Sequence, residues 1–217
     1  MNVKDPGIMP YRDAWTLQEK LHAEVLAGGE ELLLLVEHPP VITFGRRTEN
    51  EGPKHLVASK DYLKQLGVEI VQSDRGGDVT FHGPGQIVVY PIVRLNRHRL
   101  SVGGYVRKLE ETVIAALANM NVPAKRVQGC VGIWTENPKG ESEKICAIGV
   151  RIRRGVSLHG IALNVTTDLK YFDLIVPCGL IGKRVTTMKK ILGDSCPPIE
   201  TVRENLVREF VAAFSDH

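Results

Sequence analysis

The sequence lacks the marks of a membrane-spanning or secreted protein. Its longest uninterrupted aliphatic run is Leu32–Val36, whereas a helix that spans a bilayer needs about 20 apolar residues. Residues 1–10 contain no apolar stretch of the kind found in signal peptides. The four cysteines form no CxxC pair, which disfavours both a zinc site and a disulfide framework. We therefore expect a cytoplasmic protein that holds no metal and does not associate with a membrane.

Other absences count against nucleotide and nucleic-acid binding. The sequence contains neither the phosphate-binding pattern GxxxxGK[ST] nor the dinucleotide pattern GxGxxG. Its 28 basic and 25 acidic residues leave a formal net charge of +3, a surplus too small to indicate a nucleic-acid partner. The basic clusters at residues 94–99 and 151–154 keep a non-catalytic binding module open as an alternative, although such clusters are usually solvated faces or protein docking sites.

The order of the expected elements predicts the fold class. Helical periodicity and β-branched runs give two sets of elements. Helices are expected at residues 11–27, 55–66, 101–120, 184–192 and 199–214, and strands at 32–37, 41–44, 68–72, 87–93, 131–134, 144–152 and 157–165. Strands outnumber helices and often follow one another directly, which predicts an α+β fold with a mixed, largely antiparallel sheet flanked by helices. The 217 residues suit one domain.

The densest chemical signal is the segment at residues 74–86, DRGGDVTFHGPGQ. Its glycines permit positive φ angles and a close approach of the backbone to a ligand. The segment is therefore either a pair of tight turns that need glycine for their geometry, or a loop that lies against a substrate.

A lysine and two cysteines lie in informative places. Lys144, Cys146 and Ile148 belong to an expected strand, so alternation predicts that they share one face. Lys144 lies either in water at the end of the strand or in a pocket, where burial makes a lysine chemically useful. Cys178, between a proline and a glycine, is predicted on a turn with a reachable sulfur, and Cys146 is predicted to be inert packing. His159 is typical of a structural, hydrogen-bonded histidine.

Five motifs together resemble the lipoyl(octanoyl) transferase family. They are EHPPVITFG at 37–45, RGGDVTFHGPGQ at 75–86, KICAIGV at 144–150, HGIALNV at 159–165 and PCGL at 177–180. They occur in this order and cover most of the chain. The resemblance implies a fold similar to that of biotin and lipoate protein ligases, with residues 1–217 forming a single catalytic domain.

The resemblance also implies an activity and its partners. Enzymes of this family transfer an octanoyl group from octanoyl-acyl carrier protein to a specific lysine of lipoyl domains, through a cysteine thioester, in lipoate biosynthesis. The acceptors are the lipoyl domains of 2-oxoacid dehydrogenases and the H protein of glycine cleavage. No cofactor or metal is implied, because the thioester donor is already activated.

The motif match assigns roles to particular residues. Cys178 is implied as the nucleophile and Lys144 as its activating partner. The implied substrate-binding residues are Arg75, Gly76, Gly77, Asp78, Val79, Thr80, Phe81, His82, Ala147, Ile148, Gly149, Gly160, Ile161 and Ala162. Cys130 stands where the family pattern leads us to expect arginine or threonine, which makes it a second candidate for an accessible thiol.

The implied chemistry is physically consistent and leaves some choices open. A neighbouring ammonium lowers the pKa of a thiol, and the thiolate is the attacking form. Backbone N–H groups at residues 178–179 or in the turn at residues 76–77 are alternative donors to the oxyanion. An ATP-dependent lipoate or biotin ligase and a lipoyl-domain amidotransferase remain alternatives on the same fold.

Overall fold

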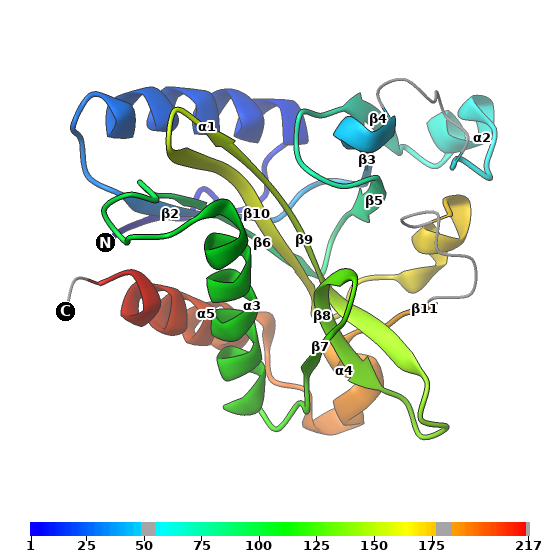
Figure 1. Cartoon of the computed structure of the whole chain (residues 1–217). Coiled ribbons are helices and arrows are strands. Elements are labelled where there is room, and N and C mark those ends of the chain that lie inside the picture. Colours follow the sequence, from blue (N-terminus) through cyan, green and yellow to red (C-terminus); the bar gives the residue numbers. More distant parts are fainter. Residues whose placement is uncertain (49–54, 177–183, 216–217) are drawn as a thin grey trace.

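One large sheet organises the chain (Figure 1). The computed structural model describes residues 1–48, 55–176 and 184–215. The sheet has the order β1-β2-β6-β10-β9-β8-β7, and β11 pairs with β9 outside this path. Its strands are β1 (Asn2–Lys4), β2 (Leu32–Val36), β6 (Gln86–Ile92), β7 (Lys125–Val127), β8 (Cys130–Glu136), β9 (Ser142–Arg153), β10 (Val156–Asn164) and β11 (Arg184–Val185).

The strand directions confirm the predicted sheet type. β1 is parallel to β2, and β11 is parallel to β9. Every other neighbouring pair in this sheet is antiparallel. The α+β prediction of a mixed, largely antiparallel sheet is therefore correct.

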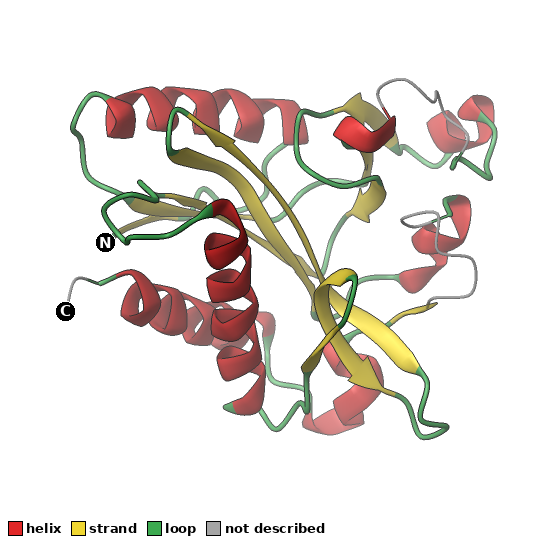
Figure 2. Ribbon diagram, viewed as in Figure 1, coloured by secondary structure: helices red, strands yellow, loops and turns green. Residues whose placement is uncertain are grey.

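Helices cover both faces of this sheet (Figure 2). α1 (Tyr11–Leu26) packs on one face, and α3 (Val102–Ala118) and α5 (Ile199–Phe214) pack on the other. β2 is apolar at every position because both of its faces are buried. Leu33 and Leu35 join the core with α3 and α5, whereas Leu34 and Val36 join the core with α1, because alternate side chains point to opposite faces.

A second, small sheet flanks the first. It has the order β4-β3-β5, formed by β3 (Val41–Phe44), β4 (Glu69–Gln72) and β5 (Val79–His82). Its own core contains Ile42, Val79 and Phe81 and continues into Phe172. The short helical elements around it are η1 (Arg46–Thr48), α2 (Lys60–Gln65) and η2 (Leu169–Leu174).

The predicted helices at 11–27, 101–120 and 199–214 are confirmed with small shifts at their ends, and two others begin later than predicted. The helix expected from residue 55 starts at Lys60, because the Ser59 hydroxyl accepts the Tyr62 N–H at 3.2 Å and so caps the helix. Residues 184–185 form β11, and α4 (Met188–Leu192) follows the cap Thr187. Gly193–Ser195 adds a short 3-10 turn, η4. In the described ranges no helix is long and apolar enough to cross a bilayer.

Candidate active site

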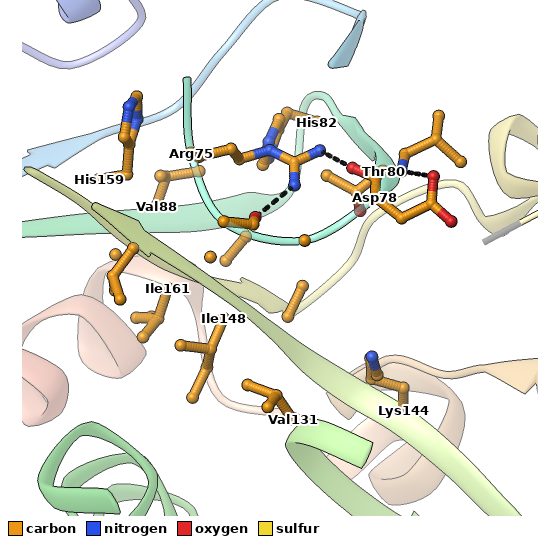
Figure 3. A pocket seen from close by; sticks show the side chains of 18 of the residues that line it. Arg75, Asp78, Thr80, His82, Val88, Val131, Lys144, Ile148, His159 and Ile161 are labelled. Atoms are coloured by element: carbon orange, nitrogen blue, oxygen red, sulfur yellow. Dashed lines mark hydrogen bonds between the residues drawn. The ribbon is translucent and has the colours of Figure 1, made fainter. Parts of the chain in front are cut away.

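A cavity of about 330 Å³ opens between the glycine-rich segment and strands β9 and β10 (Figure 3). One wall is apolar and combines side chains of three neighbouring strands, β6, β9 and β10. This wall contains Val88, Ala147 and Ala162, which belong to the core on the side of α1. Ile148 and Ile161 also line the cavity, but they belong to the core on the other face of the sheet. Opposite it, the loop from Arg75 to Asp78 and the start of β5 close the cavity. The result is a mainly aliphatic slot with polar groups at its edges.

Arg75 gives the glycine-rich segment its shape. Its side chain is buried, and its guanidinium donates to the carbonyl oxygens of Thr43 at 2.7 Å, Asp78 at 2.6 Å and Gly76 at 3.0 Å. These bonds join β3 to the loop that lines the cavity. Arg75 therefore supports the cavity wall through its side chain rather than extending the guanidinium toward bulk solvent.

Glycines let this segment lie directly on β9. The Gly76 N–H donates to the Val150 carbonyl at 3.0 Å. A Cβ atom at Gly149 would lie 2.8 Å from the Gly76 oxygen, and one at Gly76 would lie 2.9 Å from the Val150 oxygen. Gly77 has a φ of +92°, which favours glycine. The interpretation that the glycines serve tight backbone geometry is therefore confirmed, and the same residues line the cavity.

Lys144 lines the cavity from β9 and is partly buried. Its Nζ lies 4.8 Å from the centre of the Trp134 ring, a distance that suits a cation–π contact. Gly132, with φ +114°, makes room for this arrangement, because a Cβ atom there would lie 3.3 Å from Lys144 Cε. Lys144 could have lain in water at the end of the strand or in a pocket, and the structure places it at the wall of the cavity.

A bulge in β9 breaks the strict alternation that the sequence predicts. Ile133 pairs with Cys146 and Trp134 pairs with Lys144, so the register shifts at Ile145. Cys146 is fully buried in the main core and Ile148 packs against the same core, whereas Lys144 lines the cavity and is not part of that core. The prediction that all three side chains share one face is therefore wrong for Lys144, because the bulge inserts one extra residue between Lys144 and Cys146.

The cysteines have different environments. Burial raises the pKa of the Cys146 thiol to about 12, although a hydrogen bond with the backbone of Ala162 and the charge of Lys144 act to lower it. A thiol that stays protonated is a poor nucleophile, as expected for inert packing. Cys130 lines the cavity. Cys178, the implied nucleophile, lies outside the described residues.

A cluster of aromatic and histidine side chains borders the cavity on the side of α1. The Tyr11 ring stacks on His82 with centroids 5.8 Å apart, and His38 bonds to the Tyr90 hydroxyl at 2.8 Å. Burial first, and then the charges of His38 and Arg75, hold the pKa of His82 well below its usual range. Burial likewise holds the pKa of Tyr90 well above its usual range. These groups are therefore neutral at pH 7.

His159 is held in place by an acidic partner. It has a φ of +57°, and its Nε2 lies 2.6 Å from Asp74 Oδ1. Arg151 donates to the other oxygen of Asp74 at 2.6 Å. Burial lowers the pKa of His159, while the hydrogen bond and charge of Asp74 act to raise it. The hydrogen-bonded role expected of this histidine agrees with these contacts.

Most of the implied substrate-binding residues meet at the cavity. The residues of this set that line it are Arg75, Gly76, Gly77, Asp78, Val79, Thr80, His82, Ala147, Ile148, Gly149, Gly160, Ile161 and Ala162. Phe81 does not line it, because its ring stacks on Tyr171 at 4.6 Å in the core of the small sheet. The motifs did not point to Tyr11, Tyr90 or Val131, which also line the cavity. Over the described ranges, no group of three or more His, Cys, Asp or Glu side chains is arranged to hold a metal ion.

Known proteins match this chain over nearly its whole length. Residues 10–211 match the family described as lipoyl protein ligase A/B catalytic domain. The octanoyltransferase of Chloroflexus aggregans is 46% identical over 211 residues, which cover 96% of this chain and 92% of that relative. The octanoyltransferase of Koribacter versatilis is 49% identical over 220 residues, which cover 100% of this chain and 85% of that relative.

Solved structures share the fold at low sequence identity. Lipoate-protein ligase A bound with ATP has a TM-score of 0.75 at 19% identity, covering 98% of this chain and 85% of that chain. The biotin protein ligase of Aquifex aeolicus has a TM-score of 0.53 at 11% identity, covering 98% of this chain and 68% of that chain. The predicted similarity in fold to biotin and lipoate protein ligases is therefore confirmed.

Proposed function

We propose a two-step mechanism for this chain, which belongs to the lipoyl protein ligase A/B catalytic-domain family and, like its relatives, is an octanoyltransferase. Its activity is octanoyl transfer in protein lipoylation. In the mechanism, Cys178 takes the octanoyl group as a thioester, and Lys144 makes the thiol reactive. The observation that carries this proposal is a lysine held at the wall of an aliphatic cavity.

The two steps balance as follows. The Cys178 thiolate attacks the carbonyl carbon of the donor thioester, the donor C–S bond breaks, and the donor thiolate takes a proton. The neutral amino group of an acceptor lysine then attacks the enzyme thioester, a C–N bond forms, the C–S bond to Cys178 breaks, and the leaving thiolate takes the proton that the nitrogen loses. The ammonium of Lys144 favours the thiolate in the first step, and a lysine can also move protons in both steps.

The cavity suits a medium-length acyl chain. Along β9, Lys144 and Val150 are six residues apart, which corresponds to about 20 Å at the usual rise of a strand. The apolar wall lies between them. Burying the seven carbons of an octanoyl tail contributes about 0.8 kcal/mol each, or roughly 5 kcal/mol before costs. We assign this wall, with Ala162 in it, to the acyl tail.

The family also suggests the partners and setting of the reaction. We propose acyl carrier protein as the octanoyl donor, and lipoyl domains of 2-oxoacid dehydrogenases and the glycine cleavage H protein as acceptors. We propose that residues 1–217 work as one catalytic domain in the cytoplasm, without a cofactor. The match of residues 10–211 to one catalytic family supports the single domain.

Intact-protein mass spectrometry after mixing with octanoyl-acyl carrier protein tests the mechanism. We expect one octanoyl adduct, located on Cys178 by peptide mapping and absent from Cys178→Ala. Cys196→Ala is the matched control, because Cys196 does not line the cavity, and it should be acylated normally. Normal acylation of Cys178→Ala would rule out this nucleophile. A requirement for ATP would instead favour a ligase.

A further inference from the structure

We propose that Asp78 and His55 form the subsite that receives the amino group of the acceptor lysine. This inference rests on the proposed function and deepens it, because it concerns the second step alone. The motif match placed Asp78 among residues that bind substrate, but it gave the carboxylate no role and did not point to His55.

The Asp78 carboxylate is fixed in place at the cavity. Its side chain is 9% exposed, and its residue lines the cavity. The Asp78 carbonyl accepts from Arg75 at 2.6 Å and from the Gly45 N–H at 3.0 Å, so the backbone is held. Oδ1 accepts the Val79 N–H at 2.7 Å. The other carboxylate oxygen, Oδ2, is the one that lies near His55.

His55 lies beside that oxygen. Its Nε2 is 3.8 Å from Asp78 Oδ2, which is within ion-pair range but too long for a hydrogen bond. Hydrogen bonds from an ammonium are about 2.8 Å long, so a single nitrogen can donate to two acceptors this far apart. The spacing therefore suits an amino group that bridges the carboxylate and the imidazole.

The Asp78 carboxylate offsets positive charge in the cavity. Lys144 and Asp78 come from opposite walls of the cavity (Figure 3). An acceptor lysine enters as an ammonium, and two positive charges close together in a partly buried site repel each other. A carboxylate offsets this repulsion and draws the acceptor nitrogen to the wall opposite Lys144.

The imidazole also gives the first proton a destination. The acceptor ammonium loses one proton to the His55 imidazole, which releases it to solvent. The neutral nitrogen attacks the acyl carbon, the C–N bond forms and the C–S bond breaks. The leaving thiolate takes the second proton from nitrogen, so protons and electrons balance.

The test separates the two half-reactions of the acyl-enzyme. Preformed octanoyl-enzyme is discharged either with a lipoyl domain or with hydroxylamine, which is neutral at pH 7 and needs no carboxylate. Asp78→Asn keeps an oxygen for the Val79 N–H, so the loop should retain its shape. We expect the ratio of lipoyl-domain discharge to hydroxylamine discharge to fall at least tenfold. His55→Gln should also lower the ratio, but less, because glutamine keeps a polar group beside Asp78 and cannot take up the proton.

Asp168→Asn is the matched control. Asp168 is exposed, lies outside the cavity, and also accepts a backbone N–H, that of Lys170 at 3.0 Å. For Asp168→Asn, the ratio of lipoyl-domain discharge to hydroxylamine discharge should equal that of the unmodified protein. Equal loss of both discharge reactions in Asp78→Asn, or an unchanged ratio, would overturn the subsite. Failure of the unmodified protein to form any acyl-enzyme would overturn the proposed mechanism instead, so the two failures are distinguishable.

Discussion

At the residue scale, the placement of charge determines which groups can react. The charge of Lys144 acts to lower the pKa of the Cys146 thiol, but burial raises this pKa by more and keeps the thiol protonated. The Lys144 side chain runs past Gly132 to the Trp134 ring, so the ammonium is held at the cavity wall. A fixed cation is a better activator than a mobile one, because no ordering cost is added when the thiolate forms.

Replacing Lys144 should produce a defect that high pH partly repairs. Without the ammonium, the nucleophilic thiol returns toward an ordinary pKa of about 8.5 and is mostly protonated at pH 7. Lys144→Met should therefore be acylated slowly at pH 7 and recover in part near pH 9. The measurement is the rate of acyl-enzyme formation against pH. Cys178→Ser is the control and should not recover. A Lys144→Met defect that does not change with pH would point to proton transfer or positioning instead.

Enlarging Ala162 should shorten the preferred acyl chain. Ala162 is buried at the apolar wall, and leucine adds three carbons there. Displacing two methylene groups of an octanoyl tail loses about 1.6 kcal/mol, or roughly a tenfold change in kcat/KM. The check is kcat/KM for donors from butanoyl to decanoyl. An Ala162→Leu enzyme with the original preference would remove this residue from the acyl pocket.

At the element scale, the cavity depends on how closely a loop can approach a strand. The segment around Gly76 lies against β9 at Gly149. A Cβ atom at either glycine would lie less than 3 Å from a backbone oxygen of the other element. Neither element encloses the cavity alone. The basic clusters also belong to this scale, because Arg94 bonds to the Gly29 carbonyl at 2.8 Å, while Arg151 pairs with Asp74 and Arg153 with Glu19. These arginines stabilise contacts between elements, which weakens the case for a binding module.

Adding a methyl group at Gly149 should therefore separate the loop from β9. Gly149→Ala forces a backbone shift, and we expect a loss of about 1–3 kcal/mol in the free energy of unfolding, together with weaker acylation. Urea unfolding and acyl-enzyme formation provide the two measurements. Gly103→Ala is the matched control, because Gly103 lies in α3 with nothing within 4 Å of its Cβ position. The free energy of unfolding of Gly103→Ala should rise by up to about 1 kcal/mol. If Gly149→Ala is no less stable than Gly103→Ala, the close contact between the loop and β9 is contradicted.

At the scale of the whole molecule, buried neutral histidines tie stability to pH. Burial lowers the pKa of His38 to about 4, although its hydrogen bond to the Met9 carbonyl acts in the opposite direction. Burial also lowers the pKa of His82 and His159. The unfolded chain therefore binds protons, below about pH 6.5, that the folded chain does not. Stability rises with pH across this window and is lost as the pH falls.

The free energy of unfolding should consequently be lower at pH 5 than at pH 7. The shift of His38 alone predicts a fall of about 2 kcal/mol between these values, and the other two histidines act in the same direction. Urea unfolding at both pH values measures it. His38→Gln should show a smaller difference between pH 5 and pH 7, whatever its absolute stability. Equal stability of the unmodified protein at the two pH values would contradict neutral burial of this histidine.

The sequence alone determined the features that depend on near neighbours along the chain. The longer helices and the main strands follow from periodicity, because each face of an element is buried or solvated as a whole. The motifs also identified most residues of the cavity, including Gly76, Gly149 and Ala162. At Gly76 and Gly149 they carry this information because close backbone contacts leave no room for a side chain.

Only the tertiary structure decided how those residues meet. The register shift at Ile145 separates Lys144 from Cys146, and it arises from pairing with β8 rather than from the local pattern. Tyr11 and Tyr90 come from α1 and β6, and nothing in their own segments shows that they border one cavity. His55 and Asp78 are 23 residues apart. Such neighbours are set by strand order and by the packing of whole elements, which local periodicity does not encode.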